Sequence, residues 1–224
     1  MIEENIENIL SQLPRDVRLV AVSKFHPFES VLEAYSAGQR LFGESRPQEL
    51  CAKAVQLPQD IEWHFIGHLQ TNKLKSVLPY VSMVESVDSE HLLSAIDDWG
   101  NANGRVVPVL LEMHVALEET KQGFMEEEIL DILFRAVAGS FSHIRFCGLM
   151  GMATNTDDEE TIDADFARIA DFKAYLTDLF PELEDFRELA IGMSGDYKIA
   201  LRHGSTIVRI GTSIFGERDY SKTE

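Results

Sequence analysis

The sequence predicts an α/β fold, a single (β/α)8 barrel of the TIM type with an extra helix at its amino-terminal end. Short strand-like segments alternate with helical segments along the chain, and eight such units favour closure into a barrel. The first strand contains the continuous apolar run 19–22, which is typical of a strand buried on both faces of a parallel sheet. The length of 224 residues suits one barrel of this kind. An open doubly wound sheet shows the same alternation and remains the alternative.

Hydrophobic spacing places the expected elements in order. An opening helix with Ile2, Ile6 and Ile9 on one face ends before Pro14. The eight expected strands are 17–22, 40–42, 61–66, 83–86, 106–115, 144–150, 188–191 and 207–210. The expected helices between them are 28–35, 48–55, 72–78, 89–101, 125–138, 159–179 and 197–202. Asp88 is expected to cap the helix at 89–101, because its carboxylate accepts a hydrogen bond from an otherwise unpaired backbone N–H.

Composition and charge exclude several classes of protein. The net charge of −18 repels nucleic-acid backbones and anionic lipids, so neither is an expected partner. Cys51 and Cys147 have no metal-ligand spacing and are expected to be reduced thiols. The first ten residues contain no Lys or Arg, which is wrong for a signal peptide, and no apolar run is long enough to span a membrane. We therefore expect a cytoplasmic protein with one domain, 1–224.

One amine lies where a barrel usually carries its functional groups, at the end of a strand. Lys24 follows the first strand, and an amine held there out of water can attack a carbonyl carbon. A solvent-exposed lysine leaving the barrel is the alternative. His64 and His68 are four residues apart, but no acidic or thiol partner completes a metal site beside them, so none is expected.

The last two strands lead into turns rich in small residues. The segments are 192–196, with Ser194 between two glycines, and 204–213, which contains Gly211 and Thr212. Loops after strands seven and eight of such barrels commonly hold phosphate, because backbone N–H groups and hydroxyls converge there. The glycines could instead serve only tight turns. Together with Lys24, these turns indicate a ligand that has both a phosphate and a carbonyl group.

Four segments are similar to the pyridoxal phosphate homeostasis protein family, and the similarity runs in order from about residue 17 to residue 218. They are Ala21-Val22-Ser23-Lys24, the run 63–73 from Trp63 to Lys73, Gly148-Leu149-Met150, and a C-terminal segment made of the two blocks 192–196 and 204–212. The resemblance implies a single barrel like the N-terminal domain of alanine racemase. It also implies that Lys24 forms the internal aldimine with pyridoxal 5′-phosphate (PLP).

The resemblance further assigns the other cofactor contacts. Ser194, Gly211 and Thr212 match positions that bind the phosphate, and Arg209 matches the arginine that faces the pyridine nitrogen. This sequence departs from the family pattern in two places. Ser45 stands where the family usually has asparagine, and the segment Glu112-Met113-His114-Val115 also lacks an asparagine that is common there.

An arginine beside the pyridine nitrogen opposes protonation of that nitrogen and weakens the ring as an electron sink. Arg209 could instead pair with a carboxylate inside the barrel. Alanine racemase adds a tyrosine base from a second domain, whereas this sequence ends at Glu224 and Tyr220 is a poor substitute. We therefore expect a monomeric carrier that holds PLP and supplies it to apo forms of PLP-dependent enzymes, and that is not itself an enzyme.

Two other functions remain open. A racemase-like PLP enzyme would need a base opposite Lys24, and His114 or Lys121 is the candidate. A barrel that binds another phosphorylated metabolite, with no covalent chemistry, is the third possibility.

Overall fold

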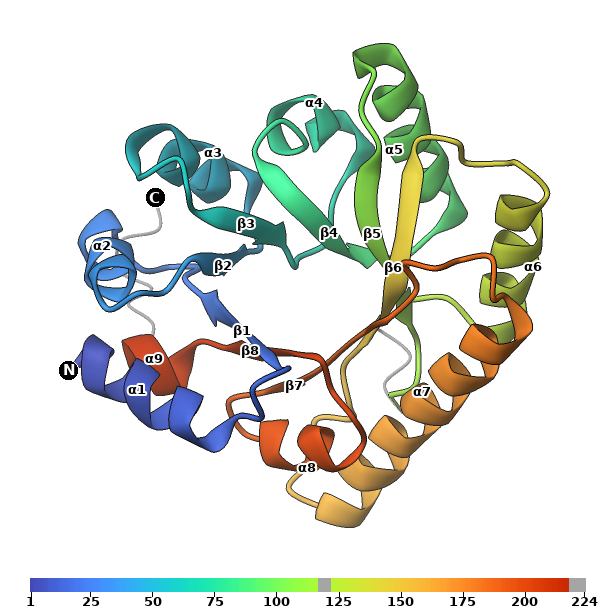
Figure 1. Ribbon diagram of the computed structural model, residues 1–224. Coiled ribbons are helices and arrows are strands. Elements are labelled where there is room, and N and C mark those ends of the chain that lie inside the picture. Colours follow the sequence, from blue (N-terminus) through green and yellow to red (C-terminus); the bar gives the residue numbers. More distant parts are fainter. Residues whose placement is uncertain (117–121, 218–224) are drawn as a thin grey trace.

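The computed structural model describes residues 1–116 and 122–217, which form a closed barrel of parallel strands ringed by helices (Figure 1). The strands pair in sequence order, and the last pairs with the first to close the ring. They are β1 (Arg18–Val22), β2 (Leu41–Glu44), β3 (Glu62–Phe65), β4 (Val81–Val87), β5 (Val107–Met113), β6 (Ile144–Gly151), β7 (Glu188–Met193) and β8 (Ile207–Ile210). The predicted closed barrel is confirmed, and the open doubly wound sheet is wrong.

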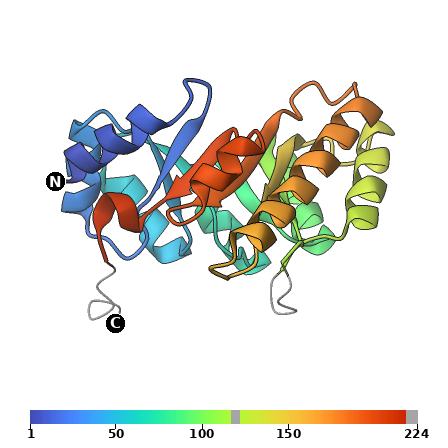
Figure 2. The ribbon, with the colours of Figure 1, turned by 90° about the horizontal axis from the view of Figure 1, so that it is seen from below.

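Helices cover the outside of the barrel and connect its strands. They are α1 (Ile2–Gln12), α2 (Phe28–Ser36), α3 (Pro47–Gln56), α4 (Leu74–Val77) after a 3-10 turn η1 (Thr71–Lys73), α5 (Glu90–Asn103), α6 (Glu126–Val137), α7 (Glu159–Leu179), α8 (Tyr197–Arg202) and α9 (Thr212–Phe215). The extra amino-terminal helix, α1, packs against α2 and α9. Figure 2 shows α1, α9, α8, α7 and α6 side by side along one flank. Within the described ranges, no helix is both long and apolar enough to cross a bilayer.

Each strand buries both of its faces, as the apolar run in β1 predicts. Val20 and Val22 belong to a cluster made only of residues from strands, which fills the barrel interior. Leu19 and Ala21 belong to the larger cluster shared with the helices. Because successive side chains of a strand point to opposite faces, these two memberships identify the inner and outer surfaces of β1.

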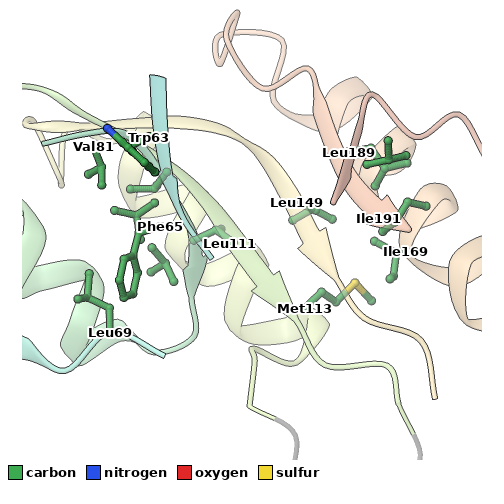
Figure 3. Close-up of a cluster of buried hydrophobic side chains, with 14 of the residues drawn as sticks. Trp63, Phe65, Leu69, Val81, Leu111, Met113, Leu149, Ile169, Leu189 and Ile191 are labelled. Atoms are coloured by element: carbon green, nitrogen blue, oxygen red, sulfur yellow. The ribbon is translucent and has the colours of Figure 1, made fainter. Parts of the chain in front are cut away.

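The outer cluster holds the helices against the strands, and Figure 3 draws part of it. Trp63 and Phe65 of β3 lie on one side of the view, and Leu189 and Ile191 of β7 lie near Ile169 of α7 on the other. A fully buried side chain of this size stabilises the fold by about 1.5–3 kcal/mol relative to an exposed one. These contacts fix the positions of the strand ends that carry the candidate site.

The structure differs from the predicted elements at the start of α5. Its N-cap is Ser89, whose hydroxyl accepts a hydrogen bond from the Leu92 N–H at 3.3 Å. The expected cap at Asp88 is therefore wrong. The helix begins one residue later than expected, and the Asp88 carboxylate lies instead 2.8 Å from Nδ1 of His68. The expected strand 106–115 is also too long, because β5 ends at Met113.

The close approach of β6 and β7 requires glycine at one position, which gives a first prediction. Gly148 has φ of +147°, and a Cβ there would overlap the carbonyl oxygen of Glu188. We expect Gly148→Ala to lower the free energy of unfolding by about 2–4 kcal/mol, measured by urea denaturation.

The matched control is Gly38→Ala, because Gly38 also has a positive φ, +96°, but a Cβ there would meet no atom within 4 Å. Its cost should be about 1 kcal/mol, from backbone conformation alone. Equal losses in the two variants would show that the contact with Glu188 does not matter.

Candidate functional site

The candidate residues lie at the end of the barrel where the strands finish and run into the following loops. The β1 ladder continues one residue past Val22, because the Ser23 N–H donates to the Gly43 carbonyl at 3.1 Å. Alternation then places Lys24 on the side of the strand that Val20 and Val22 occupy, toward the barrel interior. Lys24 is half-buried there.

Ser194 and Gly211, from the loops after β7 and β8, are in direct contact. The Gly211 N–H donates to Ser194 Oγ at 3.3 Å, and the exposed Thr212 follows at the start of α9. A Cβ at Gly211 would lie 3.2 Å from the carbonyl oxygen of Val22, so the β8 loop rests against the end of β1. The structure therefore brings the predicted hydroxyl and amide donors to the same edge of the barrel as Lys24.

Arg209 lies deeper, inside the barrel on β8, with only 5% of its surface exposed. Its guanidinium donates to the carbonyl oxygens of Ala190 at 2.8 Å and Gly151 at 3.1 Å, and to Glu85 Oε2 at 3.3 Å. The carboxylate pairing that the sequence left open as an alternative is thus present. These bonds fix the plane and position of the guanidinium.

Glu85 joins Arg209 to His64 across the barrel. Nδ1 of His64 lies 2.5 Å from Glu85 Oε1, and both side chains are buried. Burial raises the pKa of Glu85, but the hydrogen bond and charge of His64 and the charge of Arg209 outweigh it, so the pKa falls below its usual value. Sequence reasoning did not single out Glu85, although a carboxylate inside the strand predicted at 83–86 is a usable signal.

His64 and His68 do not act together. His64 contacts Glu85 inside the barrel, whereas His68 contacts Asp88 at its rim. The described part of the chain contains no group of three or more His, Cys, Asp or Glu side chains arranged to hold a metal ion.

The two departures from the family pattern also lie at this end of the barrel. Ser45 packs against the loop after β3, since a Cβ at Gly67 would lie 2.5 Å from the Ser45 carbonyl oxygen. Glu112 and His114 line a narrow gap at the end of β5 that has no room for a water molecule. Nδ1 of His114 is buried and has no hydrogen-bond partner among the described residues. Lys121 and Tyr220, which the sequence analysis considered as bases, lie outside the described residues.

Glu112 places a carboxyl group with a raised pKa at the barrel mouth. Burial raises its pKa to about 7, against the lowering effect of the Arg209 charge, while the nearby Asp88 charge raises it and His68 lowers it. Glu112 is 6% exposed, so its carboxyl group is largely removed from water.

The turn that contains Lys24 is also contacted by a second group of charged side chains, which lies on the outer side of the barrel. Lys53 of α3 donates to the Ser23 carbonyl at 2.7 Å and to Glu44 Oε1 at 2.6 Å. Glu49, one helical turn earlier, accepts from the Phe25 N–H at 2.8 Å. Sequence reasoning missed all three of these charged residues, because nothing in their local pattern shows which turn they contact.

Comparison with known proteins agrees with this arrangement. The family model described as "Alanine racemase, N-terminal domain" matches residues 1–219. A relative from Vibrio alginolyticus named pyridoxal phosphate homeostasis protein is 37% identical over 235 residues, which cover 98% of this chain and 99% of that one.

Solved structures of PipY from Synechococcus elongatus are also similar. The structure without PLP has a TM-score of 0.91 at 35% identity and covers 96% of this chain and 100% of that chain. The structure with PLP bound has a TM-score of 0.89 at the same identity and coverage. With full-length similarity in both sequence and structure, this chain belongs to the pyridoxal phosphate homeostasis protein family, whose barrel is that of the alanine racemase N-terminal domain.

Proposed function

We propose that this protein binds PLP, holds it covalently through Lys24, and takes part in PLP homeostasis by supplying the cofactor to apo forms of PLP-dependent enzymes. The observation that carries the proposal is the contact between the β8 loop and the end of β1, where Gly211 approaches Val22. It brings the strand-end amine and the donors for a phosphate to one edge of the barrel. The family name and the PLP-bound PipY structure support the choice of ligand.

The chemistry of the donor set fits PLP. A phosphate needs hydrogen-bond donors, and the β7 and β8 loops offer hydroxyls and backbone N–H groups. A Cβ at Gly195 would meet no atom within 4 Å, so the backbone of that turn is open to a ligand. An aldehyde needs an amine, which Lys24 supplies, and a pyridine nitrogen needs a donor, which the Arg209 guanidinium supplies.

Each residue has a distinct part in holding the cofactor. When bound, PLP supplies an aldehyde that bonds to an amine and a ring that withdraws electrons from that bond. Ser194 accepts from Gly211 and keeps its own O–H proton, which it could donate to a bound phosphate. Thr212 adds a second hydroxyl at the start of α9. Lys24 holds the aldehyde end of the molecule.

Arg209 sets the protonation state of the ring nitrogen. A guanidinium has only donors, so it bonds to a nitrogen that carries a lone pair and repels one that carries a proton. Its bonds to Ala190, Gly151 and Glu85 prevent it from turning away. A PLP ring held beside Arg209 would therefore be a weak electron sink, which suits a protein that holds the cofactor more than one that turns over amino acids.

A racemase-like PLP enzyme is the second candidate function, and His114 is the observation that favours it. Its Nδ1 is buried and has no partner among residues 1–116 and 122–217, and an imidazole nitrogen that carries no proton can act as a base. Racemisation would need a base on the face of the PLP ring opposite Lys24. Racemase activity is therefore to be measured on the same protein samples as cofactor transfer.

The first prediction here concerns Lys24. We expect Lys24→Ala to abolish covalent attachment of PLP and its transfer to an apo-enzyme while leaving the fold intact, because a half-buried lysine beyond the strand end contributes little packing. Borohydride reduction of the loaded wild-type protein, followed by peptide mass analysis, should place the adduct on Lys24.

The control is the wild-type protein, assayed in parallel for transfer and for racemisation of amino acids. An adduct on Lys53 or Lys73 would contradict the assignment of Lys24. Racemisation by wild-type protein that is lost in His114→Ala would favour the enzyme over the carrier.

The second prediction concerns the phosphate. Ser194→Ala and Thr212→Val should each weaken PLP binding about tenfold or more, because a hydroxyl donor to a charged group contributes about 1.5–3 kcal/mol. Equilibrium titration of the variants with PLP and with pyridoxal, which lacks the phosphate, measures this difference. Equal losses for both ligands would place the phosphate site elsewhere.

The third prediction follows from Glu112. In the unfolded chain this carboxyl ionises near its ordinary pKa of 4.5, whereas burial raises its pKa in the fold to about 7. Between these pH values the folded state binds the extra proton, so the free energy of unfolding falls as the pH rises through this window. The full shift corresponds to about 3 kcal/mol, at about 1.4 kcal/mol for each pKa unit.

The measurement compares urea denaturation of wild type and Glu112→Gln at about pH 4.5 and about pH 8. Since Arg209, Asp88 and His68 are present in both proteins, the difference between the two pH profiles isolates Glu112. Parallel profiles would show that Glu112 titrates normally in the folded protein.

A further inference from the structure

The turn that carries Lys24 has an unusual backbone. The His26 N–H donates to the Ser23 carbonyl at 3.1 Å, which closes a four-residue turn with Lys24 and Phe25 at its centre. Phe25 has φ of +65°, in the left-handed region that a residue with a bulky side chain rarely adopts. Such a conformation costs free energy and persists only where surrounding contacts hold it.

The peptide groups on both sides of Lys24 are bonded to charged side chains of α3. The carbonyl of Ser23, which precedes Lys24, accepts from Lys53 Nζ at 2.7 Å. The N–H of Phe25, which follows Lys24, donates to Glu49 Oε2 at 2.8 Å. Glu49 and Lys53 are four residues apart on the same helix, with Oε2 and Nζ 3.5 Å apart. We call these two residues the α3 clamp.

The α3 clamp is itself held in place. Lys53 is 3% exposed, and its ammonium also contacts Glu44 Oε1 at 2.6 Å, the same oxygen that accepts from the Ser23 hydroxyl at 2.6 Å. Arg46 lies 3.0 Å from the other oxygen of Glu49, Oε1, and its guanidinium lies 5.2 Å from the centre of the Phe25 ring. Both members of the clamp therefore have additional partners that fix their positions.

Stability alone gives a weak reason for this arrangement. A buried ion pair loses so much hydration that apolar residues of the same volume often stabilise a fold as well or better. Glu44 is fully buried, and its Oε2 atom has no hydrogen-bond partner among the described residues. The charged groups instead fix the planes of the two peptide groups that flank Lys24, and these planes determine where the Cα–Cβ bond of Lys24 points.

We propose that Glu49 and Lys53 are positioning residues that hold the Lys24 turn so that the amine of Lys24 is directed into the barrel mouth for covalent attachment of the cofactor. The inference rests on the proposed attachment of PLP at Lys24. The clamp acts from the outer face of the barrel, through the backbone, and does not itself contact the ligand. The α3 clamp is expected to raise the rate at which Lys24 bonds to the PLP aldehyde, since an amine that points elsewhere must first reorient.

The experiment uses full-length apo-protein in three forms: wild type, Glu49→Ala and Glu49→Gln. Glutamine keeps an oxygen that accepts from the Phe25 N–H, whereas alanine removes it. We expect Glu49→Ala to slow the appearance of the visible band of lysine-bound PLP about tenfold, the effect of losing one hydrogen bond to a charged group, and Glu49→Gln to restore most of the rate. Affinity for pyridoxine 5′-phosphate, which has no aldehyde, should be unchanged in both.

Two further variants test the second clamp residue and the specificity of the effect for the Lys24 turn. Lys53→Met keeps the volume of the side chain and removes its donors, and it should slow attachment as Glu49→Ala does. Glu188→Gln removes the 2.9 Å ion pair with Arg18 at the start of β1, the opposite end of that strand, and should leave the rate unchanged. Hydrogen exchange of the Phe25 amide gives a readout without ligand, and it should be faster in Glu49→Ala than in wild type.

The outcomes separate the two proposals. Wild-type protein that forms no band overturns the attachment at Lys24 and the inference with it. A wild-type protein that forms the band, with Glu49→Ala and Lys53→Met equally fast, overturns the α3 clamp alone. So does unchanged exchange at Phe25, and so does an equal loss of attachment rate and pyridoxine 5′-phosphate affinity, which would show a general disruption of the site.

Discussion

The polar centre of this barrel depends on one buried carboxylate, that of Glu85. It contacts His64 at 2.5 Å and Arg209 at 3.3 Å, and Arg209 in turn bonds to backbone carbonyls of β6 and β7. Five strands are thereby connected through groups inside the barrel. Removal of the carboxylate would leave the guanidinium buried without its counter-charge, which typically costs about 3–5 kcal/mol. The floor of the candidate site is therefore held in place by contacts within the protein that need no bound ligand.

The two faces of the strands hold different residues of the candidate site in place. Arg209 is held from the inner face, by Glu85 and by carbonyls of neighbouring strands. The Lys24 turn is held from the outer face, by Glu49 and Lys53 of α3. Because alternate residues of a strand point to opposite faces, the supports of Lys24 occupy none of the interior space that a ligand needs. Ser23 and Lys24 are an example: the Ser23 hydroxyl bonds to Glu44 on the outer face, whereas the next residue, Lys24, lies on the inner face.

The sequence is informative where the signal is local and periodic. The apolar run at 19–22 and the alternation of eight units predict the barrel, and the expected helices 159–179 and 197–202 have the observed bounds. Asp88 and Ser89 are both good caps by residue type, but Ser89 caps the helix while Asp88 contacts His68, which lies 20 residues earlier in the chain. The contacts of Glu85, Glu49 and Lys53 could not be predicted for the same reason, since their partners come from other strands and turns.

If this acidic chain holds PLP as proposed, the phosphate of the cofactor experiences two different electrostatic environments. Within the β7 and β8 loops, hydroxyl and amide donors act at hydrogen-bond distance, where the field of remote surface charges is small: at physiological salt, screening reduces it over about 8 Å. Outside these loops, a chain with a net charge of −18 offers few places for a phosphate to bind without specificity. Retention of the phosphate then depends on a few short contacts, and a phosphate that leaves them is repelled by the surface. That combination suits the proposed role of holding a cofactor and passing it on, because it opposes recapture at other places on the same molecule.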